Sequence, residues 1–245
     1  MKLEVIGFNI KSCITAQESG AKRIELCSGP GEGGTTPSFA FIKSARELLH
    51  IDLYVMIRPR GGDFLFSDDE FNMMKKNIEI CKDSGCDGIV TGMLLKNGKV
   101  DKKRCKELLD LAYPMEATFH RAFDRVKDPF ESLEDIIDLG FERILTSGLK
   151  PKAVDSTDLL SQLIKKSGGR IIIMPGSGIT SQNIISIYES TGATEFHSSA
   201  SVPEKSKMEY INPEMNESLD HISVNGEEVR KMADLLEKHN INKLG

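Results

Sequence analysis

Residues 56–64 (MIRPRGGDF) combine groups that bind small anions. Two guanidiniums, a glycine pair and a carboxylate directly follow an apolar run that is typical of a strand. Side chains alternate faces along a strand and proline keeps the backbone extended, so we expect Arg58 and Arg60 to project from one face, with Asp63 close by. Two fixed cations aimed at one place predict a substrate-binding pocket.

A second concentration of chemistry lies at residues 118–124 (TFHRAFD). His120 is suited to general acid–base catalysis, because an imidazole titrates near neutral pH and responds to charged neighbours. Arg121 and Asp124 would tune or orient it. A structural interpretation also fits the pattern, with His120 as a hydrogen-bonded core residue beside an Arg121–Asp124 pair. Both interpretations remain open at this point.

Charged residues recur near other predicted strands, at Glu4, Glu25, Glu195 and His197. If the sheet closes, side chains of inward parity meet at the mouth of the barrel. Buried charges of both signs are stable only when paired and hydrogen-bonded, so such a cluster is either an ion-pair network or a site that awaits a ligand. We take Glu25, Glu195 and His197 as further catalytic candidates.

Short polar turns follow the last three predicted strands, at residues 146–148 (TSG), 175–178 (PGSG) and 198–199 (SS). Backbone amides in such turns hold phosphate or carboxylate groups, and barrels often bind phosphate after strands seven and eight. Turns of this composition also serve as plain connectors. The substrate-binding candidates here are Ser147, Gly176, Gly178 and Ser198.

The five cysteines are scattered and odd in number, which predicts reduced thiols in a cytoplasmic protein rather than a disulfide framework. No cluster has the spacing of a structural zinc site. Cys27 ends a predicted strand and shares parity with Glu25, and a thiolate there would suit Cu(I), which prefers sulfur ligands. Cys27 is therefore the candidate metal ligand, although a single thiol supplies only part of a Cu(I) site.

Eight short β-rich runs alternate with amphipathic helical segments such as 68–82, whose apolar residues recur at helical spacing. The predicted strands are 3–6, 23–27, 53–57, 88–91, 116–119, 143–146, 170–174 and 195–197. Glycines that end a helix before a strand recur every 52 to 65 residues, at Gly20, Gly85, Gly140 and Gly192. This repeat predicts an α/β fold, a (β/α)8 TIM barrel in a single domain over residues 1–245, with an open doubly wound sheet as the alternative.

Two connections are longer than turns. The Gly-rich loop 28–36 follows the second strand, with Thr36 as the predicted helix N-cap and Pro37 at the first helical position. The loop 199–225 follows the eighth strand. Long loops at the carboxyl ends of barrel strands are usually lids over a site.

Composition restricts the partners. The chain has 245 residues, is 39% hydrophobic and carries a net charge of −5, as an ordinary globular protein does. This balance argues against nucleic acid and anionic membrane as partners. No leader and no apolar run of about 20 residues is present, so we expect a cytoplasmic protein with a small ligand.

The chain resembles the CutC copper homeostasis family over nearly its whole length. The matching stretches are RIELCSGPGEGGTTPS (23–38), MIRPRGGDF (56–64), TFHRAFD (118–124), FERILTSG (141–148), MPGSGI (174–179) and EFHSSA (195–200). The resemblance implies a cytoplasmic barrel, often a homodimer or higher homo-oligomer, that is associated with copper tolerance and in some members of the family with Cu(I) binding through cysteine.

Carried over residue by residue, the resemblance places the copper ligand at Cys27. A second cysteine of the family falls where this chain has Ile6, which departs from a two-thiolate site. The late loop retains Met208, Tyr210 and Asn212 of a family pattern, with acidic Glu209 where a basic residue is familiar.

Three hypotheses result. The first is a copper homeostasis protein that binds Cu(I) at Cys27. The second is a TIM-barrel enzyme for a small phosphorylated or carboxylated metabolite, linked to copper only indirectly: Arg58 and Arg60 grip the anion, His120 moves a proton, and Glu25 or Glu195 orients it. The third is a scaffold whose charges form only an ion-pair network.

Overall fold

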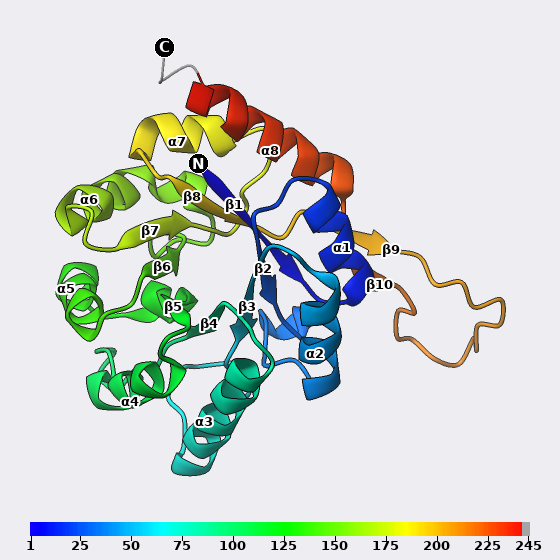
Figure 1. Cartoon of the computed structure of the whole chain (residues 1–245). Helices are drawn as coiled ribbons and strands as arrows, with labels where there is room; N and C mark the ends of the chain where they lie inside the picture. Colours follow the sequence, from blue (N-terminus) through cyan, green and yellow to red (C-terminus); the bar gives the residue numbers. More distant parts are fainter. Residues whose placement is uncertain (242–245) are drawn as a thin grey trace.

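The computed structural model describes residues 1–241, which form a barrel of eight parallel strands with helices on the outside (Figure 1). The predicted fold is confirmed. The strands are β1 (Lys2–Gly7), β2 (Arg23–Leu26), β3 (Asp52–Met56), β4 (Gly88–Thr91), β5 (Glu116–Phe119), β6 (Arg143–Thr146), β7 (Ile172–Pro175) and β8 (Glu195–Ser198). Hydrogen bonds link them in the order β7-β6-β5-β4-β3-β2-β1-β8. The prediction extended β2 and β3 one residue too far and began β7 two residues too early.

The outer layer consists of eight helices in the described residues. They are α1 (Ile10–Glu18), α2 (Phe39–Leu48), α3 (Asp68–Asp83), α4 (Lys102–Ala112), α5 (Pro129–Leu139), α6 (Thr157–Ser167), α7 (Ile184–Thr191) and α8 (Gly226–Ile241). α3 illustrates why they form: a Ser67–Glu70 capping box starts it, and its apolar stripe faces the strands. None of these helices is long and apolar enough to cross a membrane.

The strands separate an apolar layer from a polar interior. On β1, Leu3 and Val5 pack against the helices in the main hydrophobic cluster, whereas Glu4 between them is fully buried on the other face. Successive side chains point to opposite sides of a strand, so the intervening residues fill the barrel. This alternation brings charged groups from several strands to the barrel axis.

The loop after β2 differs from its prediction. α2 begins at Phe39 with Ser38 as its N-cap, two residues beyond the predicted Thr36. Thr36 instead bonds to Arg58, which follows the end of β3. Its hydroxyl accepts a hydrogen bond from the Arg58 amide at 2.8 Å and donates one to the Arg58 carbonyl at 3.1 Å. The loop is thereby fastened beside Arg58.

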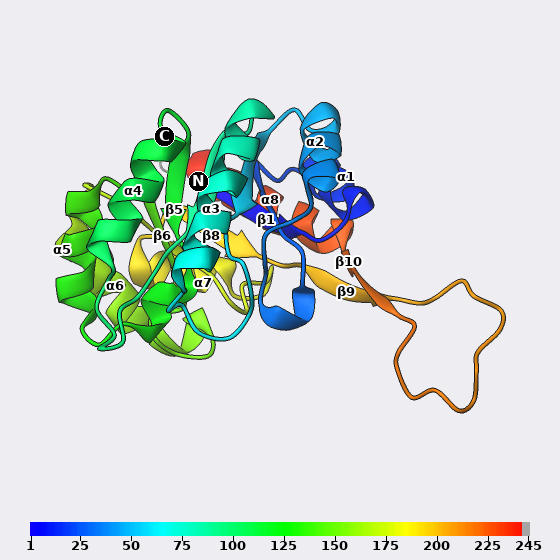
Figure 2. The same cartoon turned by 90° about the horizontal axis from the view of Figure 1, so that it is seen from below.

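The segment 199–225 is a β-hairpin rather than a loop. β9 (Ser201–Glu204) and β10 (His221–Val224) pair antiparallel and lie beside α1, and residues 205–220 join them in an extended tip that we call the arm. Figure 2 shows the arm projecting sideways from the barrel. It does not cover the barrel mouth as a lid would.

Candidate functional site

A pocket of about 360 Å³ lies at the carboxyl ends of the strands. Its apolar lining includes Ile6, Met56, Phe64 and Leu145. Eight lining residues carry polar side chains: Glu25, Arg58, His120, Arg121, Ser177, His197, Ser199 and Ser201. A concave pocket with a few convergent polar groups is the usual form of a small-molecule site.

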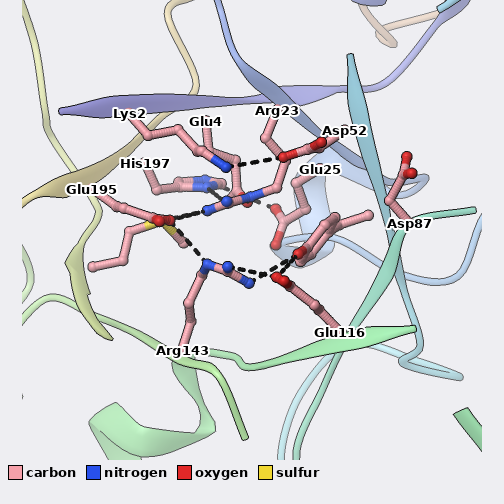
Figure 3. Close-up of polar contacts among 12 residues, drawn as sticks. Lys2, Glu4, Arg23, Glu25, Asp52, Asp87, Glu116, Arg143, Glu195 and His197 are labelled. Carbon is pink, nitrogen blue, oxygen red and sulfur yellow. Dashed lines mark hydrogen bonds and ion pairs between the residues drawn. The ribbon is translucent and has the colours of Figure 1, made fainter. Parts of the chain in front are cut away.

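Beneath the pocket, a network of buried ion pairs fills the barrel (Figure 3). Arg23 on β2 is fully buried and donates to Glu4 on β1 and Glu195 on β8, both at 2.5 Å. Arg143 on β6 donates to the buried Glu195 at 2.9 Å and, at the edge of the network, to the exposed Glu116 at 2.6 Å. The strands are thus cross-linked through their side chains.

Glu195 belongs to this network and does not lie at the barrel mouth, where the sequence predicted it. It begins β8 at the end opposite the mouth, its carboxylate is held by two guanidiniums, and it does not line the pocket. The sequence reasoning missed Arg23 and Arg143 as interior charges. A signal was present, because both begin strands after the repeated helix–Gly motif, and Arg23 shares parity with Glu25.

One level higher, His197 lies between two carboxyl groups (Figure 3). Its Nδ1 donates to Glu4 Oε1 at 2.7 Å, and its Nε2 lies 3.8 Å from Glu25 Oε2. The Cys27 thiol donates to the same Glu25 oxygen at 3.6 Å, whereas Glu25 Oε1 is buried with no hydrogen-bond partner among the described residues. Glu25 therefore has one buried carboxyl oxygen whose hydrogen-bonding capacity is unused within the described residues.

The environments of the two carboxyl groups separate their pKa values. Burial opposes the ionisation of Glu4, but Arg23 and His197 outweigh it and lower the Glu4 pKa to about 2. Burial raises the pKa of Glu25 to about 7, with Glu4 adding to the shift and His197 opposing it. The His197 pKa is raised because Glu25 and Glu4 outweigh its own burial. The Glu25 carboxyl group consequently exchanges its proton near neutral pH, next to an imidazole whose protonated form is favoured.

The opposite wall combines Arg58 and His120. Arg58 is buried and donates to the carbonyls of Glu32, Gly34 and Gly62 at 2.8 to 3.0 Å, while its Nε has no partner among the described residues. The ring of Phe64 stacks on both Arg58 and His120, with centroid distances of 4.9 Å. A positive group is therefore fixed rigidly in the wall.

His120 is a neutral hydrogen-bond donor. Burial and the nearby Arg58 lower its pKa to about 3. Its Nδ1 accepts from the Ala122 amide at 3.3 Å, so the single ring proton lies on Nε2, which has no partner in the described part of the chain. This N–H is therefore a buried donor with no acceptor among the described residues, on a residue that lines the pocket.

Asp124 is held by several hydrogen bonds, including the pair with Arg121 that the structural interpretation of its motif expected. It accepts from Arg121 Nε at 2.7 Å, from Thr146 Oγ1 at 2.5 Å and from the Ser147 amide and hydroxyl at 3.0 Å. Neither Asp124 nor Ser147 lines the pocket, whereas Arg121, whose side chain is 43% exposed, does. The clamp fixes the position of Arg121.

The turn after β7 also reaches the pocket, through Ser177 and Gly178. Gly176 does not line it, and a Cβ there would lie 2.5 Å from Leu145, so close packing explains that glycine. Ser198 bonds the Ile179 carbonyl at 2.7 Å, and the neighbouring Ser199 lines the pocket instead.

Arg58 and Arg60 do not converge. β3 ends at Met56, so strand alternation no longer applies at position 60. Arg60 bonds Glu70 at 2.7 Å and Asp63 at 3.0 Å, and neither Arg60 nor Asp63 lines the mouth pocket. Arg60 and Asp63 both lie in the outer part of the loop that follows β3.

The residues around Cys27 do not fit Cu(I). Burial and the adjacent Glu25 raise the pKa of the Cys27 thiol well above its usual value, and Ile6, in the same buried cluster, supplies no second thiol for Cu(I). Glu4, Glu25 and His197 bring three ligand atoms within 4.8 Å of one another, but Arg23 bonds Glu4 at 2.5 Å and opposes a cation there.

Sequence comparison identifies the family of this barrel. The sequence profile of the CutC family matches residues 1–202. The chain belongs to the CutC family. The human copper homeostasis protein cutC homolog is 47% identical over 210 residues, which cover 86% of this chain and 77% of the human protein. The CutC family protein of Parabacteroides distasonis is 48% identical over 86% of this chain and 87% of its own length.

Solved structures agree with this assignment. A crystal structure of CutC from Streptococcus agalactiae, named for copper homeostasis, superposes with a TM-score of 0.78 at 32% identity, over 81% of this chain and 98% of that chain. A thiamine phosphate pyrophosphorylase from Pyrococcus furiosus matches with a TM-score of 0.59 at 13% identity, over 97% of this chain and 96% of its own. That second likeness concerns the fold alone.

Proposed function

We propose that this CutC-family protein contributes to copper homeostasis as an acid–base enzyme for a small carboxylated or phosphorylated metabolite, with an indirect link to copper. The observation that carries this proposal is a set of three unpartnered polar atoms on residues that line one pocket: Glu25 Oε1, Arg58 Nε and His120 Nε2. Buried polar atoms without partners are costly, so such a set indicates a missing ligand.

The pocket favours an anion. Arg58 and Arg121 both contribute permanent positive charge, and the hydroxyls of Ser177, Ser199 and Ser201 add donors at the rim. The nearest carboxyl group, Glu25, shares its environment with protonatable His197 and carries a full negative charge only above neutral pH. Guanidinium groups and hydroxyls are the donors that recognise carboxylate and phosphate.

Glu25, rather than His120, is the proton carrier in this proposal. A general acid or base works best with a pKa near the ambient pH, which the Glu25 pKa of about 7 satisfies and the His120 pKa of about 3 does not. Neutral His120 instead donates its Nε2 hydrogen to an oxygen of the substrate. A carboxylate base opposite a neutral imidazole donor suits proton transfer at a carbon next to a carbonyl group.

His197 and Glu4 support this proton transfer. Glu4 accepts from His197 Nδ1 and so orients the ring with Nε2 toward Glu25. Glu4 is itself held by Arg23, which keeps it ionised. Protonated His197 therefore holds positive charge next to Glu25 and can return a proton to the Glu25 carboxyl group after each cycle.

We place this enzyme in the cytoplasm, as a homo-oligomer.

Ligand binding tests the proposal through thermal unfolding. A panel of small phosphorylated and carboxylated metabolites should contain compounds that raise the melting temperature, since a ligand at 100 times its Kd stabilises a protein by about 2.7 kcal/mol. Arg121→Met should abolish the shift. Arg60→Met is the matched control, because Arg60 lies outside the pocket and its loss should leave the shift unchanged.

Glu25→Gln separates binding from catalysis. It removes the proton carrier but keeps a polar side chain, so a ligand found in the panel should still bind while exchange of its acidic C–H hydrogen with solvent deuterium ceases. The NMR signal of that hydrogen reports the exchange. Absence of any stabilising anion, or exchange that persists in Glu25→Gln, would reject the proposal.

The rival function, Cu(I) sequestration at Cys27, has its own measurement. An anaerobic titration of wild type and Cys27→Ala against a Cu(I) chelator compares their affinities. The raised thiol pKa leads us to expect equal affinities. A loss of one tightly bound Cu(I) per chain in Cys27→Ala would establish the rival instead.

A further inference from the structure

The arm, residues 205–220, lacks a partner within its own chain. All residues from 207 to 219 are exposed, and their hydrogen bonds stay within the arm in the described structure. It presents exposed apolar side chains at Met208, Tyr210, Ile211, Met215 and Leu219. Ordering such a segment costs conformational entropy that only burial against another surface can offset.

A groove with matching apolar character lies beside the mouth pocket. It has a volume of about 550 Å³ and is formed by the loops after β3 and β4 together with Arg125. Leu65 and Leu95, exposed by 38% and 42%, supply its apolar surface. Phe64 lines both the groove and the mouth pocket, so the two cavities are neighbours.

The charges of the arm and the groove are opposite. Lys205 pairs with Asp220 at the neck of the arm, which leaves Lys207 against three glutamates at positions 209, 214 and 217. On the groove, Lys96 and Arg125 are exposed and form no ion pair with any residue that the structure describes, whereas the one carboxylate in its lining, Asp63, is paired with Arg60 at 3.0 Å. The arm and the groove therefore match in two properties: both carry apolar side chains, and their unpaired charges are of opposite sign.

The arm does not reach the groove of its own chain. It leaves the barrel beside α1 and extends sideways, whereas the groove lies among loops further round the barrel (Figures 1 and 2). We propose that the arm of one copy docks into the groove of a second copy. A two-fold pair can exchange arms reciprocally, because each copy has one arm and one groove.

Docking would also affect the mouth pocket. Phe64 is the wall shared with the groove, and it stacks on Arg58 and His120. An arm seated on the outer side of Phe64 would hold that ring, and hence both polar groups, in place. This inference concerns assembly and does not depend on the acid–base chemistry proposed above.

Charge exchange in the full-length chain tests the docking. Sedimentation velocity over a concentration series gives the dimer Kd of wild type. The arm variant Glu209→Lys/Glu214→Lys/Glu217→Lys and the groove variant Lys96→Glu/Arg125→Glu should each raise the Kd at least tenfold. An equimolar mixture of the two variants should associate more tightly than either alone. Lys76→Glu/Lys103→Glu, with the same charge change on α3 and α4, is the control and should match wild type.

Photo-crosslinking locates the contact. Tyr210→p-benzoylphenylalanine, prepared in nitrogen-15-labelled and unlabelled forms and mixed, should give crosslinked peptides from residues 62–65 or 94–98 that join a labelled and an unlabelled copy. Crosslinks confined to one copy, crosslinks to another face, or a wild-type protein that stays monomeric at all concentrations would each overturn the proposal.

Discussion

At the scale of single residues, the proposed chemistry depends on Glu25, whose surroundings oppose its ionisation. Buried Glu25 faces Glu4, His197, the Cys27 thiol and, more distantly, Arg23. Its pKa in the folded protein, about 7, exceeds the ordinary value of 4.5. The stability that it contributes is therefore fully present below about pH 4.5 and is lost as the pH rises through 7. The raised pKa of His197 acts in the same direction.

Urea unfolding at pH 5 and pH 8 should show this dependence. We expect wild type to lose more stability between these pH values than Glu25→Gln, by on the order of 3 kcal/mol, because the variant has no carboxyl group to ionise at this position. Glu209→Gln on the exposed arm is the control and should follow wild type. An identical loss in wild type and Glu25→Gln would show that Glu25 titrates normally.

The cysteines offer an independent test of the same surroundings. Cys27 is fully buried with a raised thiol pKa, whereas Cys86 is slightly exposed and its pKa is lowered by a hydrogen bond from Cys81, against the effect of burial. Alkylation requires an accessible thiolate. Iodoacetamide at pH 8 should modify Cys86 first and leave Cys27 intact, as read by peptide mass spectrometry. Rapid labelling of Cys27 would contradict its protonated, enclosed state.

Residue roles were only partly predictable from the sequence. Strand alternation identified Glu25 and His197 as inward-facing, but it could not distinguish His197 from Glu195, which has the same parity and lies near the opposite end of β8. For Arg60 the alternation failed, because β3 ends at Met56. The neutral state of His120 depends on burial and on Arg58, which are three-dimensional properties.

At the scale of elements, the buried ion pairs hold β1, β2, β6 and β8 together. Elements themselves were predictable, because helix-ending glycines and apolar runs are local signals, whereas the hairpin β9–β10 pairs residues 17 or more positions apart across the arm. The network is equally non-local. Arg23 forms ion pairs with Glu4 on β1 and Glu195 on β8. Loss of the Arg23 guanidinium would remove this positive charge from both carboxylates in the barrel centre.

Arg23→Met should therefore destabilise the fold strongly. Breaking a buried ion pair costs about 3–5 kcal/mol, since a charge is left uncompensated. Arg170→Met is the control: its pair with Glu134 is exposed by 47% and 39%, so its loss should cost no more than about 1 kcal/mol. Urea denaturation of both variants at pH 7 measures the difference. Equal costs would mean that the interior network is solvated.

At the scale of the whole molecule, the barrel has one seam. β7 and β8 are neighbours in space, but no ladder of hydrogen bonds joins them within residues 1–241, so they form the two ends of the hydrogen-bonded order. Each of these strands is paired on one side only. His197 lies on β8, so the proposed proton carrier's neighbour sits at the part of the barrel with the weakest backbone connections.

Hydrogen exchange should reveal this seam. Amides in β7 and β8 should exchange at least about tenfold faster than those in β3 and β4, which are paired on both sides, because local opening follows the weakest backbone pairing. A bound anion would bridge walls contributed by several strands and should slow exchange in β8 while leaving α4, remote from the pocket, unchanged. Uniform protection of all eight strands would show instead that side-chain ion pairs alone close the barrel as firmly as a hydrogen-bonded ladder.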